Sequence, residues 1–390
     1  MAPTQSITHI IFLIFTGTAV LSTFALFTRQ SLLVMYIALG AMLGPWGLKL
    51  VKDPILINEI GDIGIVFLLF LLGLNLQPQN LLHSLRKMSW ITVASSLVFF
   101  CVGSSVGILF KFTFLESMLI GVSMMFSSTI IGLKLLPTTI LHHQHTGELM
   151  ISILLLQDII AIVVLFFLHA IGDHEFSLGD LGYVISALPL LLLLAFFCER
   201  FILTKLFARF DKIHEYIFIL SIGWCLCLAE ISHFMGLPEE IGAFIAGIVL
   251  ASNPISLYIA ENLKPLRDFF LVLFFFAMGA TFEFNYLPSI IFPAAVLAFL
   301  ILIVKPYIFS QLLRGSGEIK YTCWEIGVRL GQASEFSLLI IYLALQLHFV
   351  STQANYLIQA TTIITFIVSC YWVMLRYPTP LASIDRLRRD

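Results

Sequence analysis

The sequence predicts an all-α protein that crosses a membrane many times. Hydrophobic residues make up 59% of the chain and charged residues only 11%, whereas soluble domains are roughly one quarter charged. A surface that faces water needs more charge than this, so most of the outer surface must face lipid. The net charge of −2 and the lack of a long basic run give no indication of nucleic-acid binding.

About thirteen apolar segments are long enough to cross the hydrocarbon core, which takes about 20 helical residues. The ninth segment is short, and its boundary with the tenth is the least defined. The connections are short, so we expect one transmembrane domain over residues 1–376 and a tail over 377–390. The predicted spans are 8–27, 31–49, 55–75, 89–110, 115–136, 148–171, 181–207, 213–234, 237–253, 266–282, 287–312, 323–347 and 355–376.

Basic residues predict the orientation, because loops on the cytoplasmic side carry an excess of lysine and arginine. With the N-terminus outside, the outer loops hold only Lys49, Lys52 and Lys111. Thirteen spans then place the C-terminus in the cytoplasm. The cytoplasmic side holds fifteen: Arg29, Arg86, Lys87, Arg200, Lys205, Arg209, Lys212, Lys264, Arg267, Arg314, Lys320, Arg376, Arg386, Arg388 and Arg389.

Charged residues inside the spans identify candidate functional positions, since each costs about 2.5 kcal/mol or more at the membrane centre. Asp158 lies near the middle of the sixth span, directly after Gln157. An aspartate is too short to reach the headgroups from there, so we interpret Asp158 as an ion-binding centre. Lys305 and Glu335 could serve structure or function equally well. Arg329 lies close enough in sequence to neutralise Glu335, though imperfectly. Glu59, Asp62, Lys134 and Glu230 lie near span ends, where contact with the interface explains them.

Two spans contain small and hydroxylated residues where a helix would otherwise be apolar. Residues 126–132 read FSSTIIG, and residues 331–337 read GQASEFS. Such segments suit helices that break in the membrane, whose free ends can meet ions. Close helix packing explains the same residues. If spans one to six and eight to thirteen are repeats, the fifth and twelfth spans correspond. Because corresponding spans are an odd number of spans apart, they cross the membrane in opposite directions, so the repeats are inverted.

Several motifs in order resemble the membrane domain of Kef-type potassium/proton antiporters, in the monovalent cation:proton antiporter-2 family. The resemblance runs from about Ile37 to Ile341. The motifs are LGAMLGPWGLKLV (39–51), FLLGLNLQPQNL (70–81), SSTIIGLKLL (127–136), LLLQDIIAI (154–162), GLPEEIGAFIAGIVLAS (236–252), KPLRDFFLVLFFFAMGATFEF (264–284) and LGQASEFSLLI (330–340).

The resemblance implies a sodium/proton-antiporter-like fold of thirteen helices with inverted repeats. A core domain would hold two crossed, broken helices, and a scaffold domain would form a homodimer. By the match to the family's Gln-Asp pair, Gln157 and Asp158 would bind the cation and the proton. Lys305 matches a lysine that would compensate charge. Six further residues would support the site at the broken helices: Ser127, Ser128, Thr129, Gln332, Ser334 and Glu335.

The sequence departs from the family pattern in several places. Kef-type proteins continue into a nucleotide-binding regulatory domain, and we expect none in this chain. Glu239 and Glu240 occupy a stretch that is usually apolar or small, and Asp62 and Arg329 replace residues that are often apolar. These four residues have no assigned role.

A buried carboxyl group can hold a proton or a monovalent cation, but hardly both, and burial disfavours its charged form. We therefore expect exchange of K⁺ or Na⁺ for protons at Asp158, electroneutral with one carboxylate, in a bacterial inner membrane. No other cofactor is expected, and there is no glycine-rich phosphate loop that would suggest an ATP-driven pump. A channel-like conduit, a non-transporting ion sensor and an organic-anion symporter are the alternatives. The last would need a basic or hydroxyl-rich site, which the Gln-Asp pair argues against.

Three histidines before the sixth span, His142, His143 and His145, suit either a cytoplasmic pH sensor or an ordinary solvated loop. The second interpretation is the simpler one.

Overall fold

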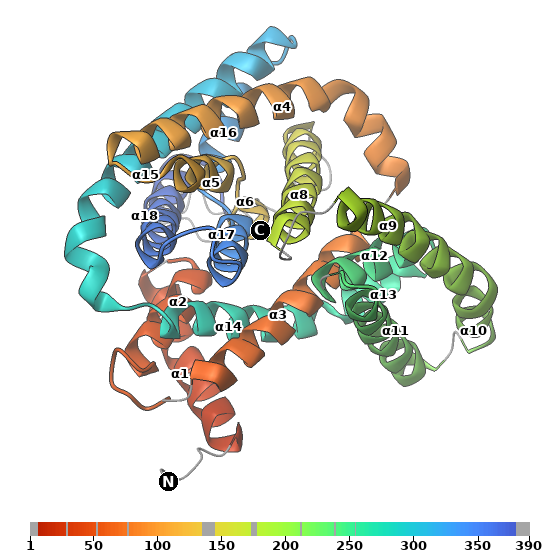
Figure 1. Cartoon of the computed structure of the whole chain (residues 1–390). Helices are drawn as coiled ribbons and strands as arrows, with labels where there is room; N and C mark the ends of the chain where they lie inside the picture. The colour runs from red at the N-terminus through yellow and green to blue at the C-terminus, as the bar shows by residue number, and fades with distance from the viewer. Residues whose placement is uncertain are drawn as a thin grey trace. The chain divides into compact units, whose positions relative to one another are not determined.

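The computed structural model describes residues 7–28, 30–51, 54–75, 78–134, 145–172, 178–210, 213–237, 239–253 and 255–379 (Figure 1). Almost all of these residues are helical. The elements are α1 Ile7–Thr28, α2 Leu32–Leu43, α3 Pro54–Asn75, α4 Pro78–Leu109, α5 Phe114–Met124, α6 Thr129–Lys134, α8 His145–Gly172, α9 Leu178–Cys198, η1 Glu199–Leu203, α10 Thr204–Arg209, α11 His214–Phe234, α12 Glu239–Ala251, α13 Ser256–Asn262, α14 Lys264–Ala280, η2 Phe284–Tyr286, α15 Leu287–Gly315, α16 Lys320–Arg329, α17 Glu335–Gln346 and α18 Thr352–Arg376.

The helices confirm the predicted all-α membrane fold. Each predicted span contains a described helix, and the fifth and twelfth spans are each divided into two, α5 with α6 and α16 with α17. Seven of the described helical segments are long and apolar enough to cross a membrane alone: α1, α4 from Met88, α8, α9 to α10, α11, η2 with α15, and α18. The seventh predicted span also contains the π-helical turn η1, which composition does not indicate.

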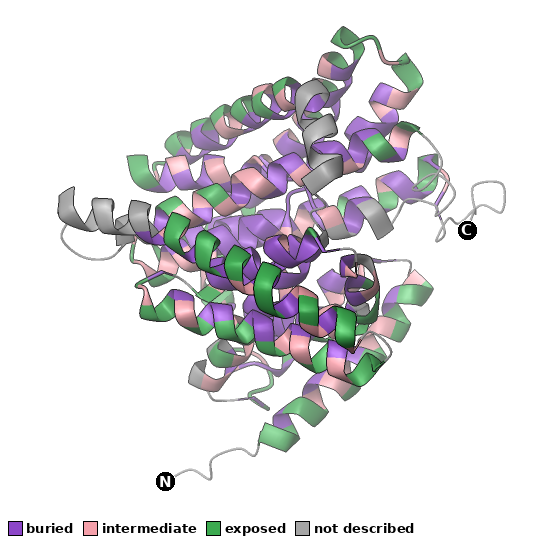
Figure 2. Cartoon of the chain, turned by 90° about the vertical axis from the view of Figure 1, so that its right-hand side faces the viewer, coloured by how far each residue is buried: buried purple, intermediate pink, exposed green. Residues whose placement is uncertain are grey.

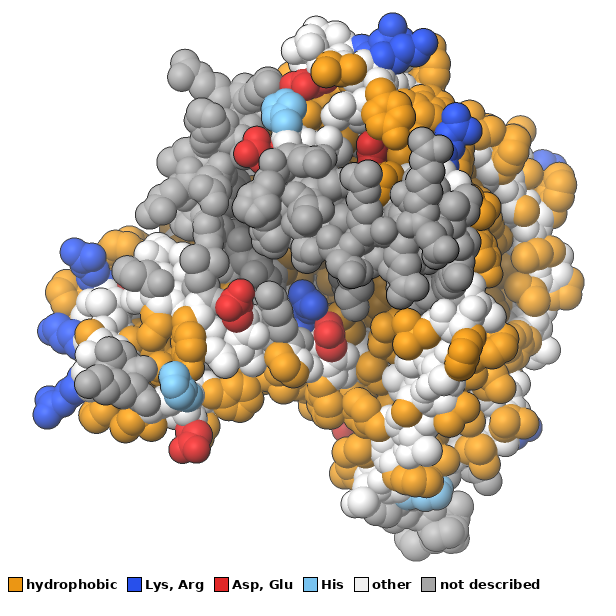
Figure 3. All heavy atoms as spheres, turned by 180° about the vertical axis from the view of Figure 1, so that it is seen from behind, with side chains coloured by type: hydrophobic (Ala, Val, Ile, Leu, Met, Phe, Trp, Pro, Cys, Tyr) orange, Lys and Arg blue, Asp and Glu red, His pale blue; other side chains and the backbone are white. Residues whose placement is uncertain are grey.

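Many described helices have one buried and one exposed face, as Figure 2 shows. Along α4, Phe99 is buried while Trp90 and Leu97 are exposed. Hydrophobic side chains cover much of the described surface on the face drawn in Figure 3. Large exposed apolar side chains on this scale are rare in water, so these faces are expected to contact lipid.

The chain divides into two compact units, of which the first comprises Met1–Leu21, Tyr36–Leu82 and His169–Phe282. Its helices α3 and α12 approach each other closely at glycines. A Cβ atom on Gly247 of α12 would lie 2.1 Å from the carbonyl oxygen of Phe70, and one on Gly73 of α3 would lie 2.5 Å from that of Phe244. Small residues allow membrane helices to pack backbone against backbone in this way.

The second unit comprises Ser22–Met35, His83–Leu168 and Glu283–Asp390. It holds α5, α6, α8 and α15 to α18, with most of α4. One apolar cluster joins α4, α8, α15 and α16: Met88, Ile91, Phe99, Leu149, Met150, Ile153, Leu154, Leu156, Phe309, Leu313, Cys323, Ile326 and Leu330. This cluster packs together the helices on which the candidate site depends.

The predicted boundary between a domain over 1–376 and a tail over 377–390 stays a prediction. Tyr377 and Thr379 are buried, and the tail from residue 380 lies outside the described residues.

Candidate functional site

Two interrupted helices meet inside the second unit. Helix α5 ends at Met124 and α6 begins at Thr129, while α16 ends at Arg329 and α17 begins at Glu335. The amide of Ser128 donates to the carbonyl oxygen of Ala333 over 3.0 Å. The hydroxyl of Ser127 donates to the carbonyl oxygen of Leu330 over 2.8 Å. The two breaks are therefore hydrogen-bonded to each other, as the crossed broken helices of the predicted fold require.

Serine side chains cap the helices that follow the breaks. Ser128 Oγ accepts from the amide of Ile131, and Ser334 Oγ accepts from the amide of Phe336. Ser337 Oγ in turn accepts from the amide of Ser334. These bonds satisfy amide groups that a helix start leaves unpaired, and no solvent is present in a membrane interior to do so. The hydroxylated residues in FSSTIIG and GQASEFS are thus local determinants of the breaks.

Helix α18 holds the second break in place. Thr365 Oγ1 accepts from the amide of Ala333 over 3.1 Å, and Ser369 Oγ donates to Gln332 Oε1 over 2.9 Å. Gln332 Nε2 lies 3.4 Å from the carbonyl oxygen of Ser128, so this residue contacts both breaks. Thr365 and Ser369 are not among the residues predicted for the site. Their spacing of four residues places both on one face of an apolar span. This pattern in the sequence could have indicated that they have polar partners.

Gln157 on α8 binds the backbone of the first break. Its Oε1 accepts from the amide of Ser127 over 3.0 Å, and its Nε2 donates to the carbonyl oxygen of Met125 over 3.2 Å. The side chain is fully buried. Both ends of the amide are therefore engaged by backbone, which sequence reasoning did not anticipate. A second lone pair on Oε1 stays available for a cation.

Asp158 follows on the same helix and is 2% exposed. The hydroxyl of Thr129, the first residue of α6, lies 3.4 Å from each of its carboxylate oxygens. The carboxyl group of Glu335, the first residue of α17, interacts electrostatically with that of Asp158. Asp158 thus lies beside the crossing, near residues from the starts of both following half-helices.

Lys305 on α15 binds the backbone of both breaks. Its ammonium group donates to the carbonyl oxygens of Phe126 and Gln332, the latter over 3.0 Å. It also lies 3.4 Å from Ser127 Oγ and 5.2 Å from the ring centroid of Phe99. Carbonyl groups just beyond a helix C-terminus carry partial negative charge. The described hydrogen bonds of Lys305 therefore go to these half-helix ends.

Arg329 forms a buried ion pair with Glu325, one helical turn earlier on α16. Its Nε and Nη2 lie 2.9 and 2.8 Å from Glu325 Oε1, and Nη2 also donates to the carbonyl oxygen of Pro378. The guanidinium carbon lies 5.5 Å from the ring centroid of Tyr377. The imperfect neutralisation of Glu335 by Arg329 that the sequence allows stays a prediction. Glu325, four residues before Arg329, was missed although such spacing favours pairing.

The acidic residues that depart from the family pattern gather in the first unit. Glu240 on α12 interacts electrostatically with Glu239 and with Asp62 of α3. Glu239 Oε1 lies 3.8 Å from His233. The side chain of Lys134 lies outside the described part of the chain.

Among the described residues, the crossing presents the buried carboxylate of Asp158, several hydroxyl and carbonyl oxygens and the buried ammonium group of Lys305. Oxygen atoms are the ligands that small, hard cations prefer. Within the described residues, no group of three or more His, Cys, Asp or Glu side chains is arranged to hold a metal ion.

Comparison with known proteins identifies the family. The family model for the sodium/hydrogen exchanger, transmembrane, matches residues 11–374. K(+) efflux antiporter 4 of Arabidopsis thaliana is 24% identical over 354 residues, or 87% of this chain and 59% of that protein. The glutathione-regulated potassium-efflux system protein KefC of Cronobacter sakazakii is 31% identical over 325 residues, or 78% of this chain and 50% of that protein. This chain therefore spans little more than half the length of these curated relatives.

A solved structure supports the fold. The sodium proton antiporter MjNhaP1 from Methanocaldococcus jannaschii, solved at pH 8, superposes with a TM-score of 0.70. The alignment covers 93% of this chain and 95% of that chain at 16% identity. The predicted resemblance to Kef-type antiporter membrane domains is confirmed, and the chain belongs to the sodium/hydrogen exchanger family of membrane transporters.

Proposed function

We propose that the protein exchanges a monovalent cation, K⁺ or Na⁺, for protons, and that Asp158 is the exchange site. The observation that carries this proposal is the position of Asp158, a buried carboxyl group beside two crossed helix breaks. Relatives named as potassium-efflux and sodium/proton transporters support the substrate class.

The chemistry at Asp158 is competition between a proton and a cation. Burial disfavours the free carboxylate, because a charge loses its hydration. Protonation and cation binding both relieve this cost, and each excludes the other. Thr129 Oγ1, which lies 3.4 Å from the carboxylate, and the second lone pair of Gln157 Oε1 would complete the cation's oxygen shell. K⁺ and Na⁺ accept the same oxygens, so these residues suit both.

Obligatory exchange follows if the loaded site can move across the membrane and the empty one cannot. An empty site would carry an uncompensated buried charge, which costs several kcal/mol, while both loaded forms are neutral at Asp158. Both broken helices belong to the second unit, so we assign this unit as the moving core. We assign the first unit as the scaffold through which two copies of the chain form a homodimer.

The broken helices support alternating access in another way. Ser127, Gln157 and Lys305 satisfy the polar backbone groups of the breaks, so the site keeps its shape without solvent. A preformed site can then face either side in turn, as in transporters with inverted repeats. We place the protein in a bacterial inner membrane, with its N-terminus outside and its C-terminus in the cytoplasm.

The test is flux in proteoliposomes that contain wild type or Asp158→Asn. With an imposed pH gradient, external K⁺ or Na⁺ should drive proton movement through wild type, and Asp158→Asn should show none. Asp268→Asn, at an exposed pair with Arg267, is the matched control and should exchange normally. Robust exchange by Asp158→Asn would overturn the proposal. Cation flux without coupled proton movement would indicate a conduit, and cation binding without flux would indicate a sensor.

A further inference from the structure

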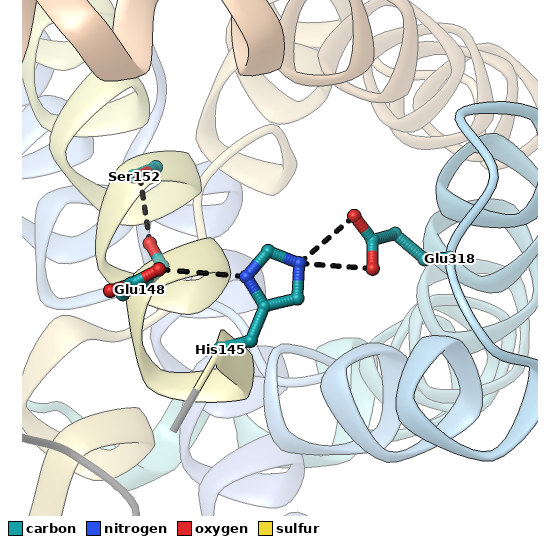
Figure 4. Close-up of polar contacts among 4 residues, drawn as sticks. All are labelled: His145, Glu148, Ser152 and Glu318. Carbon is teal, nitrogen blue, oxygen red and sulfur yellow. Dashed lines mark hydrogen bonds and ion pairs between the residues drawn. The ribbon is translucent and has the colours of Figure 1, made fainter. Parts of the chain in front are cut away.

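His145, the first residue of α8, lies between two carboxylates (Figure 4). Its Nε2 is 3.0 Å from both carboxylate oxygens of Glu318, in the connection between α15 and α16. Its Nδ1 is 3.5 Å from Glu148 Oε2, one turn further along α8. The side chain of Glu318 is 12% exposed, whereas those of His145 and Glu148 are 53% and 78% exposed. Glu318 is therefore the carboxylate that depends most on a protein partner.

The contact joins two segments that both lead to the candidate site. Helix α8 carries Asp158. The connection at Glu318 follows α15, which carries Lys305, and precedes α16, which leads to the second break. All of these elements lie in the second unit. A change in the bond between His145 and Glu318 therefore acts on both halves of the crossing.

The charge on the imidazole ring decides how many of these contacts can form. A neutral ring donates from one nitrogen only, whereas a protonated ring donates from both. Protonated His145 can thus bind Glu318 and Glu148 together. Among the described residues, further charged or titratable groups near Glu318 are Cys323 of α16 and Arg314 at the end of α15, since Cys323 interacts electrostatically with both Glu318 and Arg314. The carboxylates at the ring itself favour its charged form.

We propose that protonation of His145 closes a latch between α8 and the α15–α16 connection, and that exchange at Asp158 responds through this latch to pH on the side where α8 begins. The charge bias of the loops predicts that this side is the cytoplasm. The regulatory half of the proposal rests on the proposed exchange function. The latch itself does not.

The direction of the response follows from the sign of the charge. Histidine ordinarily changes charge between about pH 5 and 8. Partners that favour the charged ring stabilise the folded protein at the acidic end of this window, and this stabilisation is lost as the pH rises. The latch is therefore strongest in acid, where both ring nitrogens donate, and weaker in alkali, where the neutral ring donates from one nitrogen only. His145→Lys keeps the charge at all of these pH values, and His145→Gln removes it.

Thermal unfolding in detergent tests the latch without reference to transport. Between about pH 6 and pH 8, wild type should lose a stabilisation of roughly two- to fivefold in the ratio of folded to unfolded protein. His145→Gln and Glu318→Gln should each remove this pH-dependent part, and the double variant should lose no more than either. Glu148→Gln should have a smaller effect, and His9→Gln, at an exposed histidine on α1, should have none. An unchanged pH dependence in His145→Gln would show that no latch exists.

Exchange in proteoliposomes tests the regulation. At every pH, His145→Gln should exchange at the rate that wild type shows in alkali. His145→Lys should exchange at every pH at the rate that wild type shows in acid. Wild-type profiles in both variants would overturn the regulatory role even if the stability result confirms the contact. Loss of exchange by wild type itself would instead refute the proposed function and the regulation with it, and the stability measurement would still decide whether the latch forms.

Discussion

The ammonium nitrogen of Lys305 lies 3.0 Å from the carbonyl oxygen of Gln332, and the same group donates to the carbonyl oxygen of Phe126. One buried cation therefore binds the ends of both half-helices at the crossing. A positive charge there opposes the partial negative charge of two helix C-termini.

Lys305→Met should lower stability in detergent. It leaves buried carbonyl groups unsatisfied, which costs about 1–3 kcal/mol each. Thermal unfolding measures the loss, and Lys320→Met at an exposed lysine should show none. Because the described partners are carbonyls, Asp158→Asn and Glu335→Gln should not restore the lost stability. Recovery in either double variant would instead identify that carboxylate as the partner.

Gln157 should behave as a positioning residue as well as a ligand. Gln157→Ala removes the acceptor of the Ser127 amide and the donor to the Met125 carbonyl, so about 1–3 kcal/mol of stability should be lost for each buried group left unpaired. Thr129→Ala removes only the 3.4 Å contact to Asp158, and it should raise the KM for the cation with little change in unfolding. If Gln157→Ala and Thr129→Ala are equally stable, Gln157 does not position the break and its role is limited to cation binding.

The buried ion pair of Arg329 and Glu325 should contribute more to the stability of the protein than exposed ion pairs do. Arg329→Met leaves Glu325 buried without its guanidinium partner and should cost about 3–5 kcal/mol. The double variant Arg329→Met with Glu325→Met should recover most of this loss, since apolar replacement of both partners is often neutral. Breaking the exposed pair of Arg267 and Asp268 should cost less than about 1 kcal/mol. A full loss in the double variant would mean that Arg329 acts mainly through Pro378 and Tyr377.

The spans and the breaks could be predicted because the membrane constrains them directly. Apolar length identifies a span, and hydroxylated residues in FSSTIIG and GQASEFS indicate where backbone groups need other partners. Asp158 was recognisable because it cannot reach water from mid-span. These inferences depend on a residue and its immediate neighbours.

The partners of the polar side chains could not be predicted in the same way, because they depend on which helices pack together. Lys305 has both carboxylates and carbonyls within plausible reach, and only the packing of α15 against the breaks selects the carbonyls. Thr365 and Ser369 resemble ordinary packing residues until α18 is seen against Gln332 and Ala333. The partner of Arg329 at Glu325, four residues earlier on the same helix face, was not predicted.

The orientation is a separate prediction. The predicted spans put fifteen basic residues on one side and three on the other, and this bias predicts a cytoplasmic C-terminus. A reporter fused after Asp390 should be active only in the cytoplasm, and a reporter placed at the N-terminus should be active only outside. An external signal from the C-terminal fusion would reverse the topology and would move the His145 latch to the outer face.

Electroneutral exchange is the most demanding prediction, because two carboxyl groups interact at the crossing. Asp158 is the buried one, and Glu335 is only partly buried, with its Oε2 3.5 Å from the hydroxyl of Ser334. If Glu335 keeps one charge state throughout the cycle, Asp158 alone exchanges a proton for a cation. The moving unit then carries equal charge in both directions.

A clamped membrane potential measures this balance, because the potential is worth about 2.3 kcal/mol per charge per 100 mV. In proteoliposomes with an ionophore that does not conduct the transported ion, the exchange end point should be the same at zero and at inside-negative potential. A shift would show that a second group titrates during the cycle. Glu335→Gln should abolish such a shift if Glu335 is that group. A shift that persists in Glu335→Gln would point to Lys305, which would have to release a proton from its carbonyl partners each time a cation binds.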